Sequence, residues 1–199
     1  MSKFVYAVEG LDRLGKSTLI EGIQRKLGFF QVIHFGKPKR LDAYKGSIMP
    51  EYIGYDEVRC DPQLFNYQQA SFRNSMKLSQ SGARIIFDRW HLGEAVYSPL
   101  YRGYSGNYVF DLEKRLNLNH TNFVRLILLV EDFSCSQHFV SDGDSFDDGQ
   151  RENEQLLFIS AFDKSIIMDK RIICVTDPAT GLFRDADDIL KEALHDRQN

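Results

Sequence analysis

The chain has few cysteines, and they lie far apart. Cys60, Cys135 and Cys174 are an odd number among 199 residues, and no two of them form a CxxC pair. A disulfide framework needs paired cysteines, and a structural zinc site needs closely spaced ligands. The cysteines therefore predict reduced thiols and a cytoplasmic protein.

Long hydrophobic runs are also missing. The stretch "RLILLV", residues 125–130, is among the longest, and a membrane-spanning helix needs ~20 apolar residues. No signal-peptide pattern precedes the first strand-like run. We therefore expect no membrane association and a protein that stays in the compartment where it is made.

A net positive charge is lacking as well. The chain carries 25 Lys and Arg against 28 Asp and Glu, a formal net charge of −3. Proteins that bind nucleic acid irrespective of its sequence usually present a basic face. Binding to nucleic acid is therefore not expected, and the partners should be small molecules.

No Pro-, Gly- or Ser-rich linker and no repeat divides the chain. Its length and its 43% hydrophobic and 27% charged residues suit one globular domain, residues 1–199. Two segments show neither strand nor helix pattern, residues 36–60 and 141–150. Long loops in compact domains are often functional, so we expect an acceptor-side loop and a lid there.

Short apolar runs alternate with helical patterns along the sequence. The predicted strands are residues 4–8, 30–35, 84–87, 123–130 and 171–175. The predicted helices are residues 16–27, 62–81, 91–99, 111–116, 152–168 and 185–193. Such alternation indicates right-handed βαβ units. The expected fold is an α/β three-layer sandwich with a five-stranded parallel sheet.

The segment "GLDRLGKS", residues 10–17, matches the phosphate-binding pattern GxxxxGK[ST]. Glycines let backbone N–H groups turn inward around an anion, and the helix that follows adds its positive end. A glycine turn that only caps a helix is the alternative, but the match lies between a strand and a helix, as a P-loop requires. The predicted ATP contacts are Gly10, Leu14, Gly15, Lys16, Ser17 and Thr18.

A P-loop indicates a nucleotide but not a reaction, because GTPases, motor ATPases, recombination ATPases and small kinases all carry one. The sequence contains no NKxD tetrapeptide of the kind that GTPases use to read guanine. Together with the size of the chain, this favours a small-molecule kinase with ATP as the phosphoryl donor.

The run "ARIIFDRW", residues 83–90, places Asp88 and Arg89 at the carboxyl end of a buried strand. Doubly wound sheets bind ligands at that edge. Asp88, with Ser17, is predicted to hold Mg²⁺, and Arg89 to clamp a phosphate. The alternative is an ion pair that caps the next helix.

Two segments together resemble a known family. The stretches "EGLDRLGKST", residues 9–18, and "DRWHLGEAVY", residues 88–97, are similar to thymidylate kinase, whose P-loop reads EGxDxxGKST and whose third strand leads into DRYxxSxxAY. The resemblance covers the order of elements and the first half of the chain, and it implies the P-loop fold of nucleoside monophosphate kinases.

By this resemblance, the γ-phosphoryl group of ATP passes to a deoxynucleoside monophosphate, dTMP or a close analogue, giving the diphosphate and ADP. Asp12 would contact the sugar 3′-hydroxyl, and Arg89 the acceptor phosphate. Tyr97 would pack beside the sugar and help to reject ribose. Because thymidylate kinases are commonly dimers, a homodimer is implied.

Family members place a catalytic arginine either in the P-loop or in the lid. Here the P-loop carries Arg13, whereas "SDGDSFDDGQ", residues 141–150, has four aspartates and no basic residue before Arg151. Arg13, Lys16 and Asp88 are therefore the predicted catalytic residues. Because such a cation is worth roughly 10³–10⁵ in rate, we expect loss of Arg13 to cut turnover by about 10²-fold or more.

The base-binding helix departs from the family pattern FxxxR. Arg73 fills the arginine position, but Gln69 stands where the aromatic should be, so Phe65 or Phe72 would have to stack on the base. Gln69 and Arg73 are nevertheless predicted to contact the acceptor. The same helix should bury Phe65, Phe72 and Met76 on its other side.

Other departures surround the acceptor. His34 replaces an arginine after the second strand, with Lys37 as the candidate for the missing charge, and Ser98 replaces a glutamine. Arg102, in the Tyr- and Gly-rich residues 97–108, is a further acceptor candidate, although a surface loop or dimer contact explains that stretch equally well. Because of these departures, the acceptor could be dTMP, a thymidine analogue modified at the 5-position, or several deoxynucleotides.

The remaining expectations are simpler. Residues 178–181 are predicted to lie against adenine, by analogy of fold alone. Lys170 and Arg171 are expected to be solvated. Surface or capping roles are expected for four histidines, His91, His120, His138 and His195.

Two alternatives to a monophosphate kinase remain. One is a kinase of a nucleoside or of a modified base within DNA, against which the acidic pI speaks only mildly. The other is a P-loop module that binds nucleotide to regulate a partner.

Overall fold

The computed structural model describes residues 5–36, 62–102, 104–120, 123–135 and 150–195. The predicted acceptor-side loop and lid therefore lie almost wholly outside the described residues. Lys37, Cys60 and His138 lie outside them as well.

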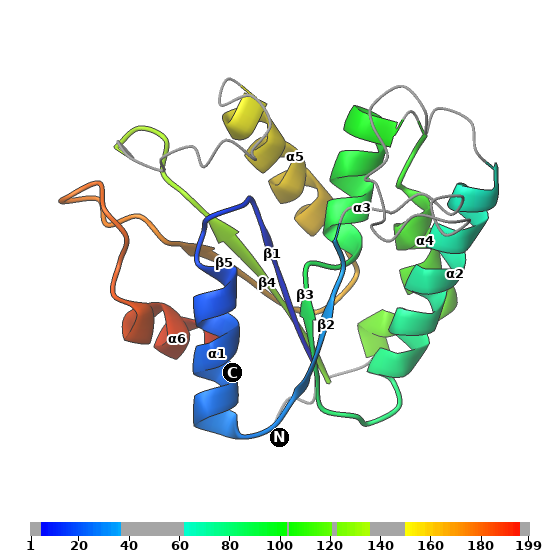
Figure 1. Cartoon of the computed structure of the whole chain (residues 1–199), viewed down its shortest axis with the longest axis horizontal. Helices are drawn as coiled ribbons and strands as arrows, with labels where there is room; N and C mark the ends of the chain where they lie inside the picture. The colour runs from blue at the N-terminus through cyan, green and yellow to red at the C-terminus, as the bar shows by residue number, and fades with distance from the viewer. Residues whose placement is uncertain (1–4, 37–61, 103, 121–122, 136–149, 196–199) are drawn as a thin grey trace, which may run out of the picture.

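Five parallel strands form one sheet in the order β2-β3-β1-β4-β5 (Figure 1). The strands are β1 (Val5–Gly10), β2 (Gln31–His34), β3 (Ile85–Asp88), β4 (Val124–Val130) and β5 (Asp169–Cys174). Each of them was predicted to within about two residues, because buried parallel strands are nearly continuous apolar runs. The predicted α/β fold with a five-stranded parallel sheet is confirmed.

Helices cover both faces of the sheet (Figure 1). They are α1 (Lys16–Leu27), α2 (Pro62–Ser79), α3 (His91–Tyr97), α4 (Tyr108–Arg115), α5 (Arg151–Lys164) and α6 (Ala186–Leu194), with a π-helical turn at Ser98–Arg102 and a 3-10 turn at Leu118–His120. Right-handed crossovers in this strand order put α1 on the face opposite α2 to α5. In agreement, α1 packs against α6, and α3 against α5 and α4.

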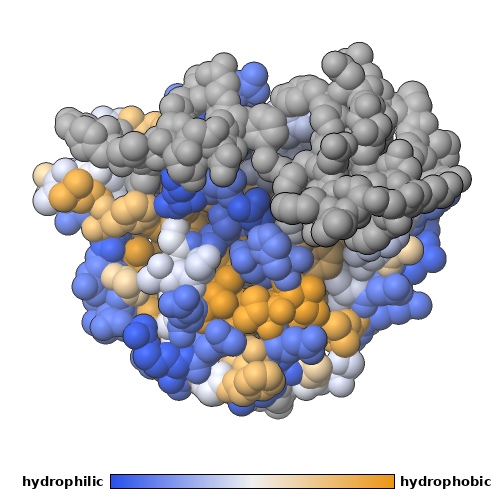
Figure 2. All heavy atoms as spheres, in the orientation of Figure 1, coloured by the Kyte–Doolittle hydropathy of each residue, from blue (hydrophilic) through white to orange (hydrophobic). Residues whose placement is uncertain are grey.

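The core is the sheet itself. Every residue of β1 and β4 is buried, whereas the edge strand β2 is mostly exposed. Figure 2 shows apolar surface over β2, between α1 and α2. Beneath α2, the ring of Trp90 stacks on Phe87 with centroids 4.6 Å apart, and its indole N–H donates to Ser75. Phe72 and Met76 are buried as predicted, whereas Phe65 is only half-buried.

Among the described residues, no helix has the length and apolar character needed to cross a bilayer.

Two expectations for polar residues are wrong. His91 is fully buried, with Nε2 2.7 Å from Oε1 of buried Glu113, whose carboxylate also accepts from the Ser165 hydroxyl. Lys170 donates to backbone oxygens at the end of α5, among them Phe162 O at 2.9 Å. Arg171 is not solvated either, because its side chain is only 12% exposed. His91 was misjudged because its partner is distant in the sequence, and Lys170 because its partners are backbone groups.

Candidate active site

The loop between β1 and α1 has a backbone that the sequence explains. Gly10, at φ 130°, passes so close to β4 that a Cβ would lie 2.5 Å from the carbonyl oxygen of Leu129. Gly15, at φ 78°, turns the chain into α1, a conformation that glycine adopts readily. Leu11 and Leu14 are buried beneath the loop. Glycines and buried leucines together fix the loop at the edge of the sheet.

Lys16 begins α1 and turns back over the loop. Its Nζ donates to the carbonyl oxygens of Gly10, at 3.0 Å, and Leu11, at 2.5 Å, and lies 3.8 Å from Oδ1 of Asp12. Burial, with a smaller contribution from the positive Arg89, lowers the pKa of Lys16 to about 8. A polyanion bound at the loop would compensate this buried charge.

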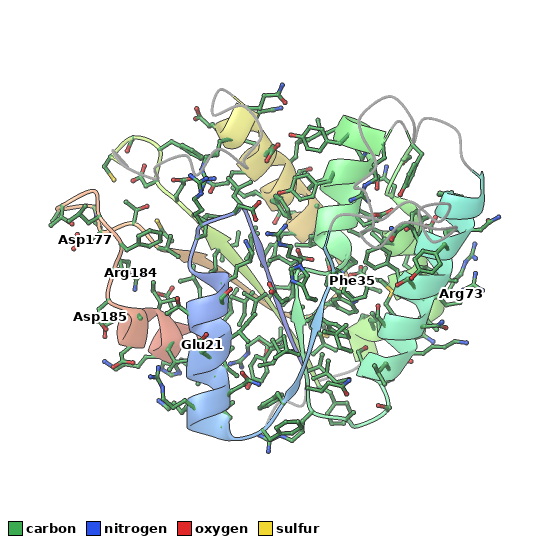
Figure 3. All side chains as sticks on the ribbon, viewed as in Figure 1. Glu21, Phe35, Arg73, Asp177, Arg184 and Asp185 are labelled. Atoms are coloured by element: carbon green, nitrogen blue, oxygen red, sulfur yellow. The ribbon has the colours of Figure 1, made fainter. Side chains whose placement is uncertain are left out.

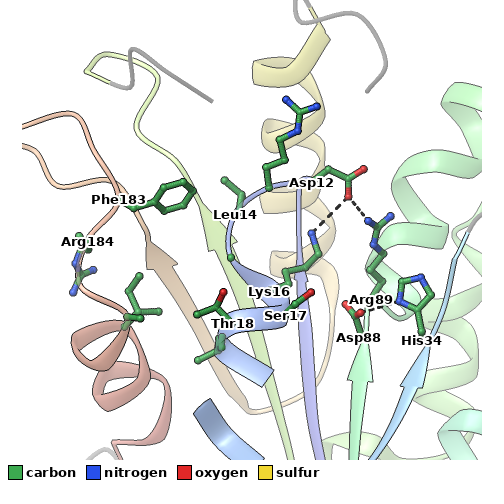
Figure 4. Close-up of a pocket in the computed structure, with 15 residues that line it drawn as sticks. Asp12, Leu14, Lys16, Ser17, Thr18, His34, Asp88, Arg89, Phe183 and Arg184 are labelled. Carbon is green, nitrogen blue, oxygen red and sulfur yellow. Dashed lines mark hydrogen bonds and ion pairs between the residues drawn. The ribbon is translucent and has the colours of Figure 1, made fainter. Parts of the chain in front are cut away.

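A cleft of about 570 Å³ opens around the loop (Figure 4). It is lined by Asp12, Arg13, Leu14, Gly15, Lys16, Ser17, Thr18, Leu19, His34, Asp88, Arg89, Phe183, Arg184, Ala186 and Ile189. Most of the predicted ATP and catalytic residues therefore meet in one place. Asp88 and Arg89 join them because β3 pairs with β1 in parallel, with Val8 opposite Asp88.

The wall after β5 differs from the prediction. Phe183 and Arg184 line the cleft, instead of residues 178–181. Phe183 is 48% exposed, and Figure 4 shows its ring near Leu14 at the side of the cleft away from Asp88. Arg184 is held by the carbonyl oxygen of Cys174, at 2.7 Å, and by Glu192. The chain turns back at Thr176, which bridges to Phe183, so the loop tip points away.

On the other side, Arg89 and Asp12 form an ion pair, drawn in Figure 4. Arg89 has a positive φ of 59°, so its backbone leaves β3 in a turn that carries the side chain toward the P-loop. Its Nε is buried, with no hydrogen-bond partner among the described residues. The ion pair therefore holds the guanidinium of Arg89 at the edge of the cleft.

His34 and Asp88 end the neighbouring strands β2 and β3 at the same level. Nδ1 of His34 lies 2.8 Å from Oδ2 of Asp88. Ser17 is exposed in the same cleft, and Figure 4 shows Ser17, Asp88 and Lys16 close to one another. A hydroxyl and a carboxylate at the foot of a phosphate-binding loop are ligands that suit Mg²⁺. No group of three or more His, Cys, Asp and Glu side chains that could hold a metal occurs in the described residues.

Tyr97 lies in a buried aromatic layer beside this cleft. Its ring stacks on Tyr101, with centroids 5.7 Å apart, and meets the edge of Phe158. Burial raises the pKa of Tyr97, and negative Glu154 and Asp12 add to the shift. Burial, with Asp12, also raises the pKa of Glu154 to about 7. No pattern in the sequence pointed to Glu154, which lies on α5.

Arg102 has a buried partner that the sequence did not reveal. Its Nη1 pairs with the carboxylate of Glu94 and lies 3.3 Å from the hydroxyl of Ser98. The hydroxyls of Tyr104 and Tyr108 also donate to Glu94, each at 2.8 Å. The side chains of the Tyr- and Gly-rich stretch thus form a hydrogen-bonded cluster around Glu94. Arg102 is held in this cluster by its ion pair with Glu94.

On α2, the predicted acceptor residues are not gathered at the cleft. Arg73 is exposed, and Figure 3 shows it on the outer side of α2, whereas Phe35 lies inside the molecule. Phe35 stacks on Phe72, with centroids 5.0 Å apart. Gln69 is half-buried. A role for Gln69 and Arg73 stays a prediction, and the position of Arg73 does not favour it.

Arg151, noted in the sequence only as the end of the acidic segment, reaches the P-loop. Its Nη2 donates to the backbone oxygen of Asp12 at 2.8 Å, and its Nε lies 2.5 Å from Oε1 of Glu131. Because 139 residues separate Arg151 from Asp12, no local pattern could have predicted this contact.

Several solved structures share this arrangement of helices and strands. YorR of Bacillus subtilis, solved with phosphorylated GDP, is 16% identical with a TM-score of 0.56, covering 94% of this chain and 91% of its own. Thymidylate kinase of Ehrlichia chaffeensis is 14% identical with a TM-score of 0.54, covering 96% and 97%. Deoxyadenosine kinase of M. mycoides, with bound dATP, is 19% identical with a TM-score of 0.51, covering 94% and 95%.

No protein-family profile matches the sequence, and no curated protein is a significant sequence match. The likeness to solved structures, at these low identities, concerns the fold. Thymidylate kinase is one of several similar proteins, beside a deoxyadenosine kinase and YorR. The chain therefore has the P-loop α/β fold that nucleotide and nucleoside kinases share.

Proposed function

We propose that this protein transfers the γ-phosphoryl group of ATP to a deoxynucleoside monophosphate, dTMP or a close analogue, giving the diphosphate and ADP. The observation that carries the proposal is the ion pair between Asp12 and Arg89. It joins the P-loop to the end of β3 and holds the Arg89 guanidinium at the cleft that the P-loop lines. An arginine so held can bind an acceptor phosphate in line with ATP.

The donor side follows from the P-loop. The loop N–H groups and the start of α1 would bind the β- and γ-phosphates, and Lys16 would leave the carbonyl oxygens of Gly10 and Leu11 for phosphate oxygens. Arg13 would place a second positive charge near the transferring group. Such transfers need no covalent intermediate, so alignment and charge supply the catalysis.

Ser17 and Asp88 would hold Mg²⁺, which neutralises phosphate charge when it is bound with ATP. The hydrogen bond between Asp88 and His34 would orient the carboxylate for this role. On the far side, the exposed ring of Phe183, which lines the cleft, would cover the adenine base. This assignment replaces the expectation for residues 178–181.

The acceptor base is less well defined by the chain. The departures at His34, Gln69 and Ser98 leave three choices, which are dTMP, a 5-substituted deoxyuridine monophosphate and several deoxynucleotides. Ser98 is buried next to Arg102, so it supports that arginine instead of facing an open pocket. We assign the sugar-facing positions to Asp12 and Tyr97.

A second candidate is phosphorylation of a nucleoside hydroxyl. The similar solved structures include a deoxyadenosine kinase with bound dATP, and the P-loop fold suits a nucleoside acceptor as well as a nucleotide acceptor.

A coupled assay of ADP release, with ATP, Mg²⁺ and one acceptor at a time, separates these candidates. The acceptors are the common nucleoside monophosphates, 5-substituted deoxyuridine monophosphates and the corresponding nucleosides. Stimulation by a deoxynucleoside monophosphate supports the main proposal. Stimulation of ADP release by nucleosides alone would instead support the second candidate. Tight ATP binding without stimulation by any acceptor would favour a regulatory module.

A further inference from the structure

Arg13 has an unusual backbone conformation for a residue with a side chain. Its φ is 67°, in the left-handed region, where the Cβ crowds the backbone. Such conformations persist where surrounding contacts fix them, and they occur often at functional sites. An anion-binding nest needs residues of alternating right- and left-handed conformation, so a left-handed residue is expected in this loop, but here it is an arginine and not a glycine.

The backbone next to Arg13 is contacted by a residue far along the chain. Nη2 of Arg151 donates to the carbonyl oxygen of Asp12 at 2.8 Å. That carbonyl belongs to the peptide unit between Asp12 and Arg13, whose orientation is set by ψ of Asp12 and φ of Arg13. A hydrogen bond to this oxygen therefore acts directly on the φ of Arg13.

Arg151 is itself anchored to the sheet. Its Nε pairs with Oε1 of Glu131, which follows β4 directly and has a side chain only 1% exposed. Glu131 is held in turn by Gln155, which accepts from its N–H and donates to its carbonyl oxygen, both at 2.8 Å. The guanidinium therefore spans from a rigid carboxylate to the P-loop. Its planar fork suits this double contact, which a lysine would not reproduce.

We propose that Arg151, held by Glu131, is a positioning residue that orients the peptide between Asp12 and Arg13 and thereby directs the Arg13 side chain into the cleft. The catalytic consequence rests on the proposed kinase function, but the effect on the backbone does not. The arrangement makes the P-loop cation dependent on a residue at the start of α5.

The kinetic test compares Arg151→Gln with Arg115→Gln, an exposed arginine at the end of α4, in the full-length protein. Arg151→Gln should lower kcat by roughly 10- to 100-fold, the range for losing a hydrogen bond from a charged group. KM for ATP should change much less, and Arg115→Gln should leave both constants unchanged. A normal kcat in Arg151→Gln would overturn the proposal.

A second background tests whether Arg151 acts through residue 13. Glycine adopts a positive φ without strain, and Arg13→Gly also removes the side chain to be directed. Adding Arg151→Gln to Arg13→Gly should therefore lower the remaining kcat by less than about twofold, because the two changes act as one unit. An equal further loss in both backgrounds would show that Arg151 acts on the substrate directly and would overturn the proposal.

A structural measurement keeps the inference separate from the choice of acceptor. The Cα and carbonyl chemical shifts of Asp12 and Arg13 report the backbone conformation whether or not any substrate is turned over. In Arg151→Gln and in Glu131→Gln/Arg151→Gln, these chemical shifts should move away from the values typical of a left-handed residue. The double variant removes the buried carboxylate charge that would otherwise be left unpaired. Unchanged left-handed shifts in the folded double variant would overturn the positioning role even if kinase activity is confirmed.

Discussion

The guanidinium of Arg89 is paired with the carboxylate of Asp12, so the arginine that follows β3 is oriented by the P-loop itself. The pairing spans 77 residues of sequence. It restrains a side chain that would otherwise be free to rotate, and such restraint lowers the entropic cost of binding a phosphate. In the proposed function, this ion pair links the donor and acceptor sides of the cleft.

Arg89→Lys tests this link. Lysine keeps the charge but lacks the planar fork, so it cannot hold Asp12 and an acceptor phosphate together. We expect KM for the acceptor to rise by roughly 10- to 100-fold, with a smaller change in KM for ATP. Steady-state kinetics with Arg115→Lys as the matched control would measure this. An unchanged acceptor KM would remove Arg89 from the acceptor site.

Lys16→Met separates the fold from ATP binding. Burial lowers the pKa of Lys16, so its charge is not favourable to the folded protein, and methionine fills a similar volume. The free energy of unfolding of the unliganded protein should change by about 1 kcal/mol or less. The increase in Tm that ATP produces in the wild type should be lost. Retention of that increase would contradict the role of Lys16.

Ser17→Ala tests the proposed Mg²⁺ ligand. The exposed hydroxyl has no hydrogen-bond partner within the described part of the chain, so stability should be unchanged. Activity should need roughly tenfold or more Mg²⁺ to reach half its maximum, as expected when a metal ligand or its support is lost. A titration of ADP release against Mg²⁺ measures this, with Thr180→Ala as a control outside the cleft. Identical Mg²⁺ curves would argue against Ser17 as a ligand.

Glu154→Gln should make stability less dependent on pH. Burial raises the pKa of Glu154 from 4.5 to about 7, so the folded protein binds this proton more tightly than the unfolded chain. The resulting stability is present below the ordinary pKa and is lost as pH rises through about 7. Glutamine cannot ionise, and it can still accept from Tyr101.

The variant should therefore match the wild type near about pH 4.5 and exceed its stability at about pH 8 by about 1–2 kcal/mol. Urea unfolding at both pH values measures the difference. A variant that is less stable than the wild type at the higher pH would show that ionised Glu154 is favourable in the fold.

The fold could be predicted because its signals are local. Each buried strand is a short apolar run, and the helices between them fix parallel pairing and handedness. The P-loop was equally readable, since Gly10, Gly15 and Lys16 must be close in sequence to build one anion site. Asp88 and Arg89 followed from the rule that ligands bind at the carboxyl ends of such strands.

The residues that were missed have partners that no local sequence pattern reveals. Glu131 and Arg151 meet only when β4 and α5 are packed, and Glu94 gathers Arg102 and two tyrosines only after the turn that follows α3. Buried charges look like surface charges in a sequence. Phe183 was missed for a different reason, because the turn after β5 folds back and moves the cleft wall two residues beyond the expected range.

The most direct test of the account is transfer of labelled γ-phosphate from ATP to dTMP, and in parallel to thymidine and to 5-substituted deoxyuridine monophosphates, with separation of the labelled products. The account predicts a labelled deoxynucleoside diphosphate, and none with Lys16→Met. Labelled monophosphate from a nucleoside and no diphosphate from any nucleotide would contradict it.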